Sequence, residues 1–340
     1  MLDLPLVARG ESGHCHLSLG DRVTDLASTL AGMSVEELDR FFYETDAEVV
    51  VGLVGETSDR EIETLLGDEA VRSAAVGSIL ARLDEYAVPE RLAGVKGTVA
   101  FRLAVPKRGQ ETYLLEFQEG GVDVVPPSTA ARTGNDPDVT VSCGMLDFVR
   151  LVTGGVNAAL LHLGDRLAIE GDELLALVVG GVFRVPGTED VAVDPTALDP
   201  ADVAVAIAKV DDTHLNAVMA GGLREVVLTE VFRRLPDYVH EKKAERQDLV
   251  IGFKIGGRRD GGSDRYVVTL REGRATVERL DDEAETGRRD ATIALNGAQF
   301  LKLVTGHLNP VTGVMRGKLK VRGDVKAALT FSGLMDIPGA

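Results

Sequence analysis

The chain has few cysteines, no long apolar run and no excess of positive charge. Cys15 and Cys143 are its only cysteines, so no disulfide framework can form, and we expect a reducing compartment. The longest apolar runs, such as Leu174–Phe183, fall far below the roughly 18 residues that a membrane span needs. No basic segment followed by an apolar run opens the sequence. These absences predict a soluble cytoplasmic protein.

The net charge of the chain is strongly negative. Its 54 acidic and 37 basic residues give −17, and a field of that sign repels a phosphate backbone. We therefore expect no nucleic-acid partner. The length of 340 residues and the 44% hydrophobic content suffice for two domains with ordinary cores.

A stretch of about fifty residues occurs twice and sets the domain count. Moving Asp138–Gly187 by 152 positions places it on Asp290–Gly339 without a gap. The first-copy residues that meet an identical residue are Asp138, Thr140, Phe148, Leu151, Val152, Thr153, Gly154, Asn157, Leu167, Gly171, Asp172, Ala176, Leu177, Gly181, Pro186 and Gly187. We predict an N-terminal extension with short strands and a helix over 1–45, a first repeat over 46–190 and a second over 198–340.

Helix and strand signals follow the same order in both copies. Capping boxes at Ser34/Glu37 and Ser58/Glu61 open helices, and longer amphipathic helices follow over Glu69–Tyr86 and Leu223–Leu235. Period-2 runs then predict five strands per copy: Val99–Val105, Tyr113–Phe117, Val122–Val125, Val139–Cys143 and Arg166–Glu170, and Val250–Ile255, Tyr266–Leu270, Ala275–Arg279, Ala291–Leu295 and Lys318–Arg322. The predicted fold is α+β, with two repeats, each a mostly antiparallel five-stranded sheet with helices packed on it, preceded by a helical hairpin.

Several repeated residues are best interpreted as structural. Gly171-Asp172 is a sharp turn followed by a helix cap, and Thr153-Gly154 is a helix end. Asn157 is a cap or a backbone tether. His14-Cys15-His16 has metal-ligating chemistry, but strand alternation separates the cysteine from the histidines and no further ligand pair stands nearby, so we predict no metal site.

An apolar stripe marks the helix that follows the fourth strand of each copy. Phe148, Leu151 and Val152, like Phe300, Leu303 and Val304, share one helix face, which ordinary core packing also explains. The following segment is apolar on nearly all sides and must face an apolar environment. From both segments the candidate ligand-lining residues are Phe148, Leu151, Val152, Leu160, Leu163, Phe300, Leu303, Val304, Val314 and Met315.

The second copy resembles a known lipid-binding family. Its pattern runs from Phe300 through Leu303, Thr305-Gly306 and Asn309-Pro310 to Gly317-Lys318-Leu319-Lys320-Val321 and Gly323-Asp324, with a closing helix to Met335, and resembles the sterol carrier protein type 2 domain. The first copy departs from it, with Ala158 after Asn157. The resemblance implies an apolar tunnel between sheet and helices that takes sterols, fatty acids or acyl-CoA, hence lipid binding or transfer without chemistry.

The second copy also carries a basic strand segment. Arg316, Lys318, Lys320 and Arg322 share a parity, so in an extended strand they would point to one face. They are candidates for contact with a lipid headgroup or an anionic membrane surface, and a solvated strand face is the alternative.

No catalytic constellation is visible. None of the six histidines occupies the same place in both copies, and none has a nucleophile or carboxylate at a motif spacing. The sequence predicts no catalytic residue, no cofactor and no particular oligomeric state. A scaffold with closed cavities and a lipid or steroid enzyme remain the alternatives to a carrier.

Overall fold

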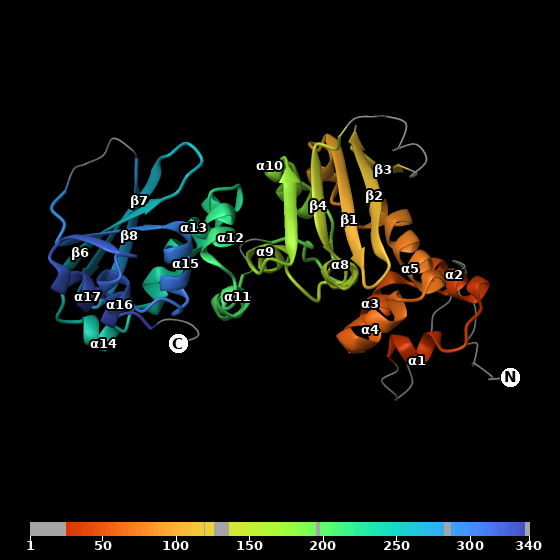
Figure 1. Ribbon diagram of the computed structural model, residues 1–340, viewed down its shortest axis with the longest axis horizontal. Coiled ribbons are helices and arrows are strands. Elements are labelled where there is room, and N and C mark those ends of the chain that lie inside the picture. Colours follow the sequence, from red (N-terminus) through yellow and green to blue (C-terminus); the bar gives the residue numbers. More distant parts are fainter. Residues whose placement is uncertain (1–24, 119, 126–135, 195–197, 282–286, 337–340) are drawn as a thin grey trace. The chain divides into compact units, whose positions relative to one another are not determined.

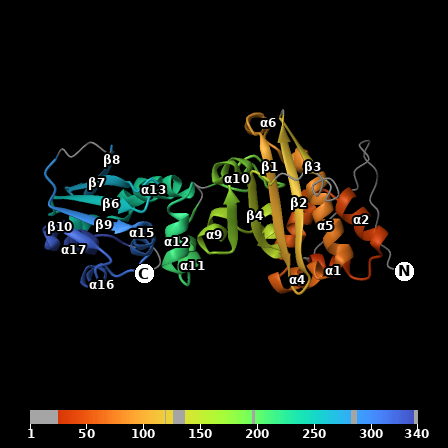
Figure 2. The ribbon, with the colours of Figure 1, turned by 45° about the horizontal axis from the view of Figure 1, so that its top comes forward.

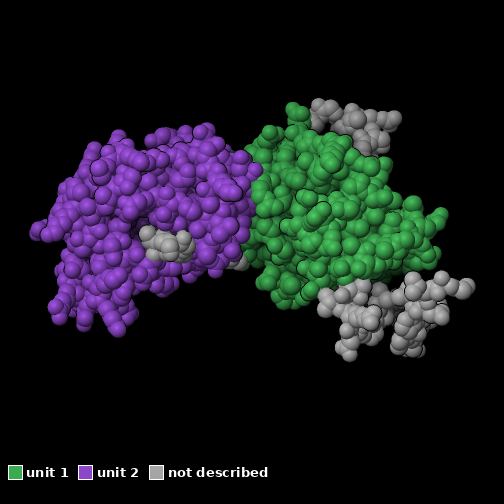
Figure 3. Space-filling model, turned by 60° about the horizontal axis from the view of Figure 1, so that its bottom comes forward, with its two compact units in different colours: residues 1–158, 166–194 green, residues 159–165, 195–340 purple. Residues whose placement is uncertain are grey.

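The computed structural model describes residues 25–118, 120–125, 136–194, 198–281 and 287–336. They form two compact units, shown in the ribbon of Figure 1 and in separate colours in Figure 3. Unit 1 contains residues 1–158 and 166–194, and unit 2 contains residues 159–165 and 195–340. A short segment of the first repeat thus belongs to the second unit. The strands expected before residue 20 and the segment His14-Cys15-His16 lie outside the described residues.

The first part of unit 1 is helical. Ser34 and Ser58 each accept a hydrogen bond from the backbone N–H three residues on, and Glu37 and Glu61 reach back to the caps, so both predicted capping boxes form. The helices are α1 (Leu26–Leu30), α2 (Val35–Glu44), α3 (Ala47–Glu56), α4 (Asp59–Leu66), α5 (Glu69–Ala81), η1 (Leu83–Tyr86) and α6 (Pro89–Leu92).

The sheet of unit 1 has the order β3-β2-β1-β4-β5. Its strands are β1 (Gly97–Val105), β2 (Gly109–Gln118), β3 (Gly121–Val125), β4 (Val139–Gly144) and β5 (Leu167–Gly171). Neighbours are antiparallel except β1 and β4, which run parallel, with Phe101 opposite Val141. Helices α8 (Met145–Val152) and α10 (Glu173–Gly180) complete the unit. The predicted mostly antiparallel five-stranded sheet with helices is confirmed.

Unit 2 repeats this topology with the order β10-β9-β6-β7-β8, and Figure 2 labels all five strands. The strands are β6 (Leu249–Gly256), β7 (Ser263–Arg271), β8 (Arg274–Leu280), β9 (Ala291–Asn296) and β10 (Lys320–Gly323). Its helices are α11 (Pro200–Ile207), α12 (Asp212–Val218), α13 (Leu223–Arg234), η3 (Leu235–Tyr238), α14 (Glu241–Ala244), α15 (Gly297–Val304), α16 (Pro310–Met315) and α17 (Val325–Gly333), together with most of α9 (Ala158–Leu163).

The repeated Gly-Asp pair closes the sheet edge as the sequence predicted. Gly171 and Gly323 have φ of +98° and +89°, and a Cβ added there would lie 2.3 Å and 2.5 Å from the carbonyl oxygens of Asp138 and Asp290. Only glycine fits this approach. The following Asp172 accepts hydrogen bonds from the backbone N–H groups of the first turn of α10.

One buried arginine per unit ties a helix to the sheet. Arg72 of α5 donates from Nε to Glu111 at 2.8 Å and from Nη1 to the carbonyl of Leu66 at 2.9 Å. Arg224, which is 152 positions further on, donates from Nε to Asp264 at 2.7 Å and from Nη2 to the carbonyl of Ile255 at 2.6 Å. These bonds satisfy a charge that would otherwise be costly to bury.

Candidate functional site

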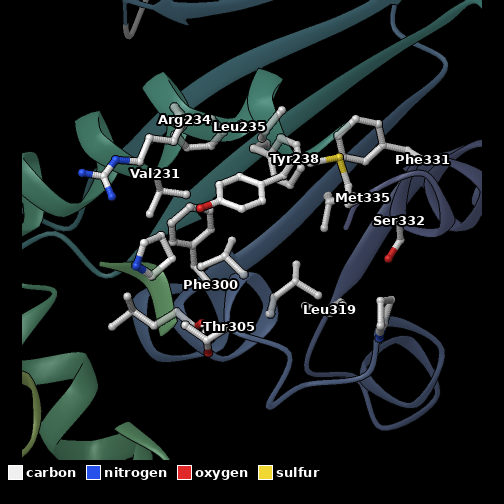
Figure 4. Close-up of a pocket in the computed structure, with 18 of the residues that line it drawn as sticks. Val231, Arg234, Leu235, Tyr238, Phe300, Thr305, Leu319, Phe331, Ser332 and Met335 are labelled. Atoms are coloured by element: carbon white, nitrogen blue, oxygen red, sulfur yellow. Dashed lines mark hydrogen bonds between the residues drawn. The ribbon is translucent and has the colours of Figure 1, made fainter. Parts of the chain in front are cut away.

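A cavity of about 160 Å³ lies in unit 2 between the sheet and the helices packed on it. A single buried water needs roughly 10 to 15 Å³ on the same measure, so the cavity has room for a chain of many atoms. Figure 4 shows side chains from α13, α15 and α17 converging on it.

The sheet supplies the floor through one row of alternating side chains. Val321 of β10 pairs with Ile293 of β9, which pairs with Phe253 of β6, and all three line the cavity. Because successive strand residues point to opposite faces, this row defines the inner face of the sheet. The same registers place Lys320 and Lys254 on the outer face.

A cluster of aromatic side chains packs between the inner face of the sheet and the helices α13 and α15. Phe232 of α13 stacks on Tyr266 with ring centroids 3.8 Å apart, and lies 5.5 Å from Phe300 and 5.6 Å from Phe253. Burial raises the pKa of Tyr266 above its ordinary value, so its hydroxyl stays protonated. Large rings with few rotatable bonds make this side of the cavity stiff.

Helices and adjoining residues from six places in the chain form the walls. In α13 and η3, Val227, Val231 and Leu235 recur at four-residue spacing and so share one face toward the cavity. The helical hairpin before α13 adds Leu198, Pro200 and Val203. The remaining wall residues come from α9, α15, α16 and α17: Leu163, Leu301, Leu303, Val304, Pro310, Val314, Ala328, Leu329 and Met335.

Leu163 reaches this cavity although its sequence lies in the first repeat. The end of α9 is held by His214 of α12, whose Nε2 lies 2.8 Å from the carbonyl oxygen of His162 and whose Nδ1 lies 3.1 Å from Asp165. The sequence had grouped Leu163 with the first repeat, and the structure places it in unit 2.

Polar groups are few at the cavity and the charged ones are mostly paired. Glu230 accepts ion pairs from Arg234 at 3.4 Å and Arg233 at 2.7 Å, and Arg234 also donates to the carbonyl of Leu198. Tyr238, Thr305, Ser332 and Asp336 complete the polar lining. The sequence analysis missed Glu230 and Arg234, although their i, i+4 spacing on a helix that also carries an apolar face was a usable signal.

The structure brings together five of the ten predicted lining residues at this cavity: Leu163, Phe300, Leu303, Val304 and Val314. Met315 projects from α16 toward solvent with 83% of its surface exposed. The other four residues of the first repeat lie elsewhere. Phe148 and Leu151 are buried in unit 1, where Phe148 packs 5.7 Å from Phe101, and Val152 and Leu160 are half-buried.

Unit 1 has a cavity of different chemistry and position. About 280 Å³ in volume, it is lined by residues that include Glu63, Met145 and Arg166, and Arg166 is ion-paired with Asp147. A half-polar lining of this kind does not match the apolar stripe predicted for that repeat. The stripe of unit 1 instead packs in its core.

The four basic residues of the second repeat do not form one row. The strand begins at Lys320, two residues later than predicted, so only Lys320 and Arg322 project from β10. Arg316 caps the end of α16 and is exposed. Lys318 turns to Asp212 at 3.4 Å, beside Lys302, and the hydrogen bond from Lys302 is the main cause that lowers the pKa of Asp212. The turn at Gly317, with φ of +69°, breaks the expected parity.

Other chemistry-bearing groups are tied into the fold. Burial raises the pKa of the Cys143 thiol to about 12, which leaves it unreactive at neutral pH. Within the described ranges, no three metal-ligating side chains come together. No helix of the described residues is long and apolar enough to cross a membrane.

Comparison with known proteins identifies the fold and its family. The model of the SCP-2 sterol transfer family matches twice, over residues 77–184 and 228–336. The chain therefore belongs to the SCP-2 sterol transfer family, with two copies of the domain. Leu198, Pro200 and Val203 precede the second match, so part of the cavity wall comes from outside the family domain.

Individual relatives are distant. Sterol carrier protein 2 of Bos taurus is 28% identical over 244 residues, covering 68% of this chain and 38% of its own length. Sterol carrier protein 2 of Arabidopsis thaliana is 32% identical over 89 residues, covering 26% of this chain and 69% of its own length. The solved structure of sterol carrier protein 2 from Yarrowia lipolytica in its apo form shares 22% identity, covering 42% of this chain and 94% of that one, with a TM-score of 0.23. The chain spans 22% to 38% of the length of the first vertebrate relatives that it matches.

Proposed function

We propose that unit 2 binds one long apolar ligand, of the fatty acid, acyl-CoA or sterol class, and carries it without chemical change. The observation that supports this is the lining of the cavity, which is apolar apart from Glu230, Arg234, Tyr238, Thr305, Ser332 and Asp336. Sterol transfer is the activity that the family name describes.

The ion pair between Glu230 and Arg234 suggests how a ligand lies in the cavity. Arg234 is 22% exposed and Glu230 13% exposed, so the pair stands at the border between cavity and water. A carboxylate or phosphate headgroup placed there gains a hydrogen bond from a guanidinium, while the alkyl chain fills the space toward Phe300 and Leu319. Transfer between lipid surfaces then requires a transient contact of unit 2 with a membrane.

Titration with fluorescent fatty acids of increasing length tests the proposal. Burial of each methylene contributes about 0.8 kcal/mol, so affinity should rise about fourfold per added carbon until the cavity is full. Native mass spectrometry of the purified protein should show copurified lipid. Flat or absent binding across the series, with a clean apoprotein, would refute the carrier and favour the scaffold alternative.

A further inference from the structure

The acidic excess of the chain lies in the N-terminal extension and the first repeat. Residues 1–194 contain 15 basic and 33 acidic residues, a net charge of −18, whereas residues 195–340 contain 22 basic and 21 acidic residues, a net charge of +1. The repulsion that the whole chain exerts on an anionic surface therefore arises from residues 1–194. The second repeat can approach such a surface without a net penalty.

The outer face of the second sheet concentrates the positive charge. Across the ladder Lys320 lies beside Ala294, Ala294 beside Lys254, and Lys254 beside Arg265. The neighbouring row on the same face, two residues along each strand, contains Arg322, Thr292, Gly252, Val267 and Glu278. In these two rows Glu278, on the far edge strand, is the single carboxylate. Lys254, Lys320 and Arg322 are exposed.

On the corresponding outer face of the first sheet, the positive charge is neutralised by a carboxylate. There Arg102 and Glu170 form an ion pair at 3.3 Å across β4. The positions 152 residues further on, Lys254 and Arg322, are both cations. Two cations therefore replace the ion pair on this face, and an anionic surface attracts both of them.

On the outer face of the sheet, the residues between the cations are small. Ala294, Thr292 and Gly252 lie between the cations, and the side chain of a further cation, Arg289, lies over Gly252. Long flexible cations on a flat floor can each reach a different phosphate on a plane of headgroups. A concave site for one soluble anion would instead need converging groups.

We propose that the outer face of the second sheet, defined by Lys254, Lys320 and Arg322, is the surface that docks on an anionic lipid bilayer. This inference rests on the proposed contact between unit 2 and a membrane, and not on the nature of the ligand. Strand β10 forms part of the face and of the cavity wall at once, because Lys320 and Arg322 point outward while Val321 points into the cavity. Docking through this face therefore brings one edge of the cavity to the headgroup layer.

Vesicle flotation with the full-length protein tests the assignment. Phosphatidylcholine vesicles with and without phosphatidylglycerol are compared for the wild type, for Lys254→Gln/Arg322→Gln, and for Lys242→Gln/Lys243→Gln. The last variant removes the same charge from exposed residues of α14. Each cation at an anionic surface changes partitioning by about fivefold, so the first variant should bind phosphatidylglycerol vesicles about thirtyfold more weakly, while the α14 variant keeps wild-type binding.

Four results would overturn the assignment: no preference of the wild type for anionic vesicles, unchanged binding of the Lys254→Gln/Arg322→Gln variant, an equal loss in both variants, or self-association of the chain through Lys254 and Arg322 in sedimentation without vesicle binding. Thermal unfolding should show that both variants fold, since the substituted side chains are exposed. A fatty-acid titration of the same variants separates the two proposals. Absence of fatty-acid binding by the wild type refutes the carrier, and absence of wild-type flotation with phosphatidylglycerol vesicles refutes the docking face.

Discussion

Replacement of Val304 by phenylalanine should fill the cavity of unit 2 and exclude the end of a long alkyl chain. Val304 lines the cavity on α15, between Leu303 and Thr305. The larger side chain adds four carbon atoms, which displace about as many methylene groups of a bound ligand. At about 0.8 kcal/mol for each, the loss is about 3 kcal/mol, or about two orders of magnitude in affinity for a chain that fills the cavity. A short chain that does not reach Val304 should lose little.

Val152→Phe is the matched control, because Val152 occupies the equivalent position 152 residues earlier. Fluorescent fatty-acid titrations of both variants and of the wild type give the affinities, and circular dichroism with thermal melting gives their folding. Val304→Phe should melt close to the wild type, since the ring enters existing space, whereas over-packing of a full core costs about 1 to 3 kcal/mol.

An unchanged affinity of Val304→Phe for long chains, in a folded protein, would refute the assignment of the cavity as the ligand site. Equal losses in both variants would mean that the two units bind alike. A lower melting temperature together with unchanged binding would show that Val304 packs in a filled core.

Further changes have distinct readouts. Asp264→Ala leaves Arg224 buried without its carboxylate and should cost about 3 to 5 kcal/mol in urea unfolding, more than Glu111→Ala, whose carboxylate is 33% exposed. The lowered pKa of Asp212 means that its interaction with Lys302 stabilises the fold fully above pH 3.8 and is lost as pH falls through the folded value, so the stability difference between the wild type and Asp212→Asn should shrink on acidification below pH 3.8. In a Cys15→Ser variant, Cys143 should stay unlabelled by a thiol reagent at pH 8 until the chain is unfolded, because burial raises its pKa to about 12.

The local structure was predictable wherever a signal is local. The capping boxes at Ser34 and Ser58, the period-2 strands and the turn at Gly171 each depend on neighbours in sequence, and all of them form, although one strand, β10, begins later than predicted. The strand β10 is shorter than predicted because parity alone does not show that Gly317 turns the backbone. The chain geometry at that turn sends Lys318 toward Asp212, more than a hundred residues away.

The cavity was predictable only in part, because its walls are set by long-range packing. The apolar stripe on α15 correctly predicted Phe300, Leu303 and Val304 as lining residues, but the equivalent stripe on α8 packs in the core of unit 1. Helix periodicity cannot distinguish a face that meets a sheet closely from one that leaves a space. Nor does it show that Leu163 would join a wall formed by the other repeat.

The two repeats differ in the charge of the outer face of the sheet, where a substitution has little effect on the stability of the fold. Side chains on the outer face of a sheet are not part of the core, so exchanging Arg102 and Glu170 for Lys254 and Arg322 leaves the inner rows and the caps unchanged. A duplicated domain can therefore change the charge of one surface by reversing a single ion-pair partner. In this chain the neutralised face lies in the acidic repeat and the cationic face lies beside the apolar cavity, and this arrangement fits the proposed carrier, whose cavity would approach lipid headgroups.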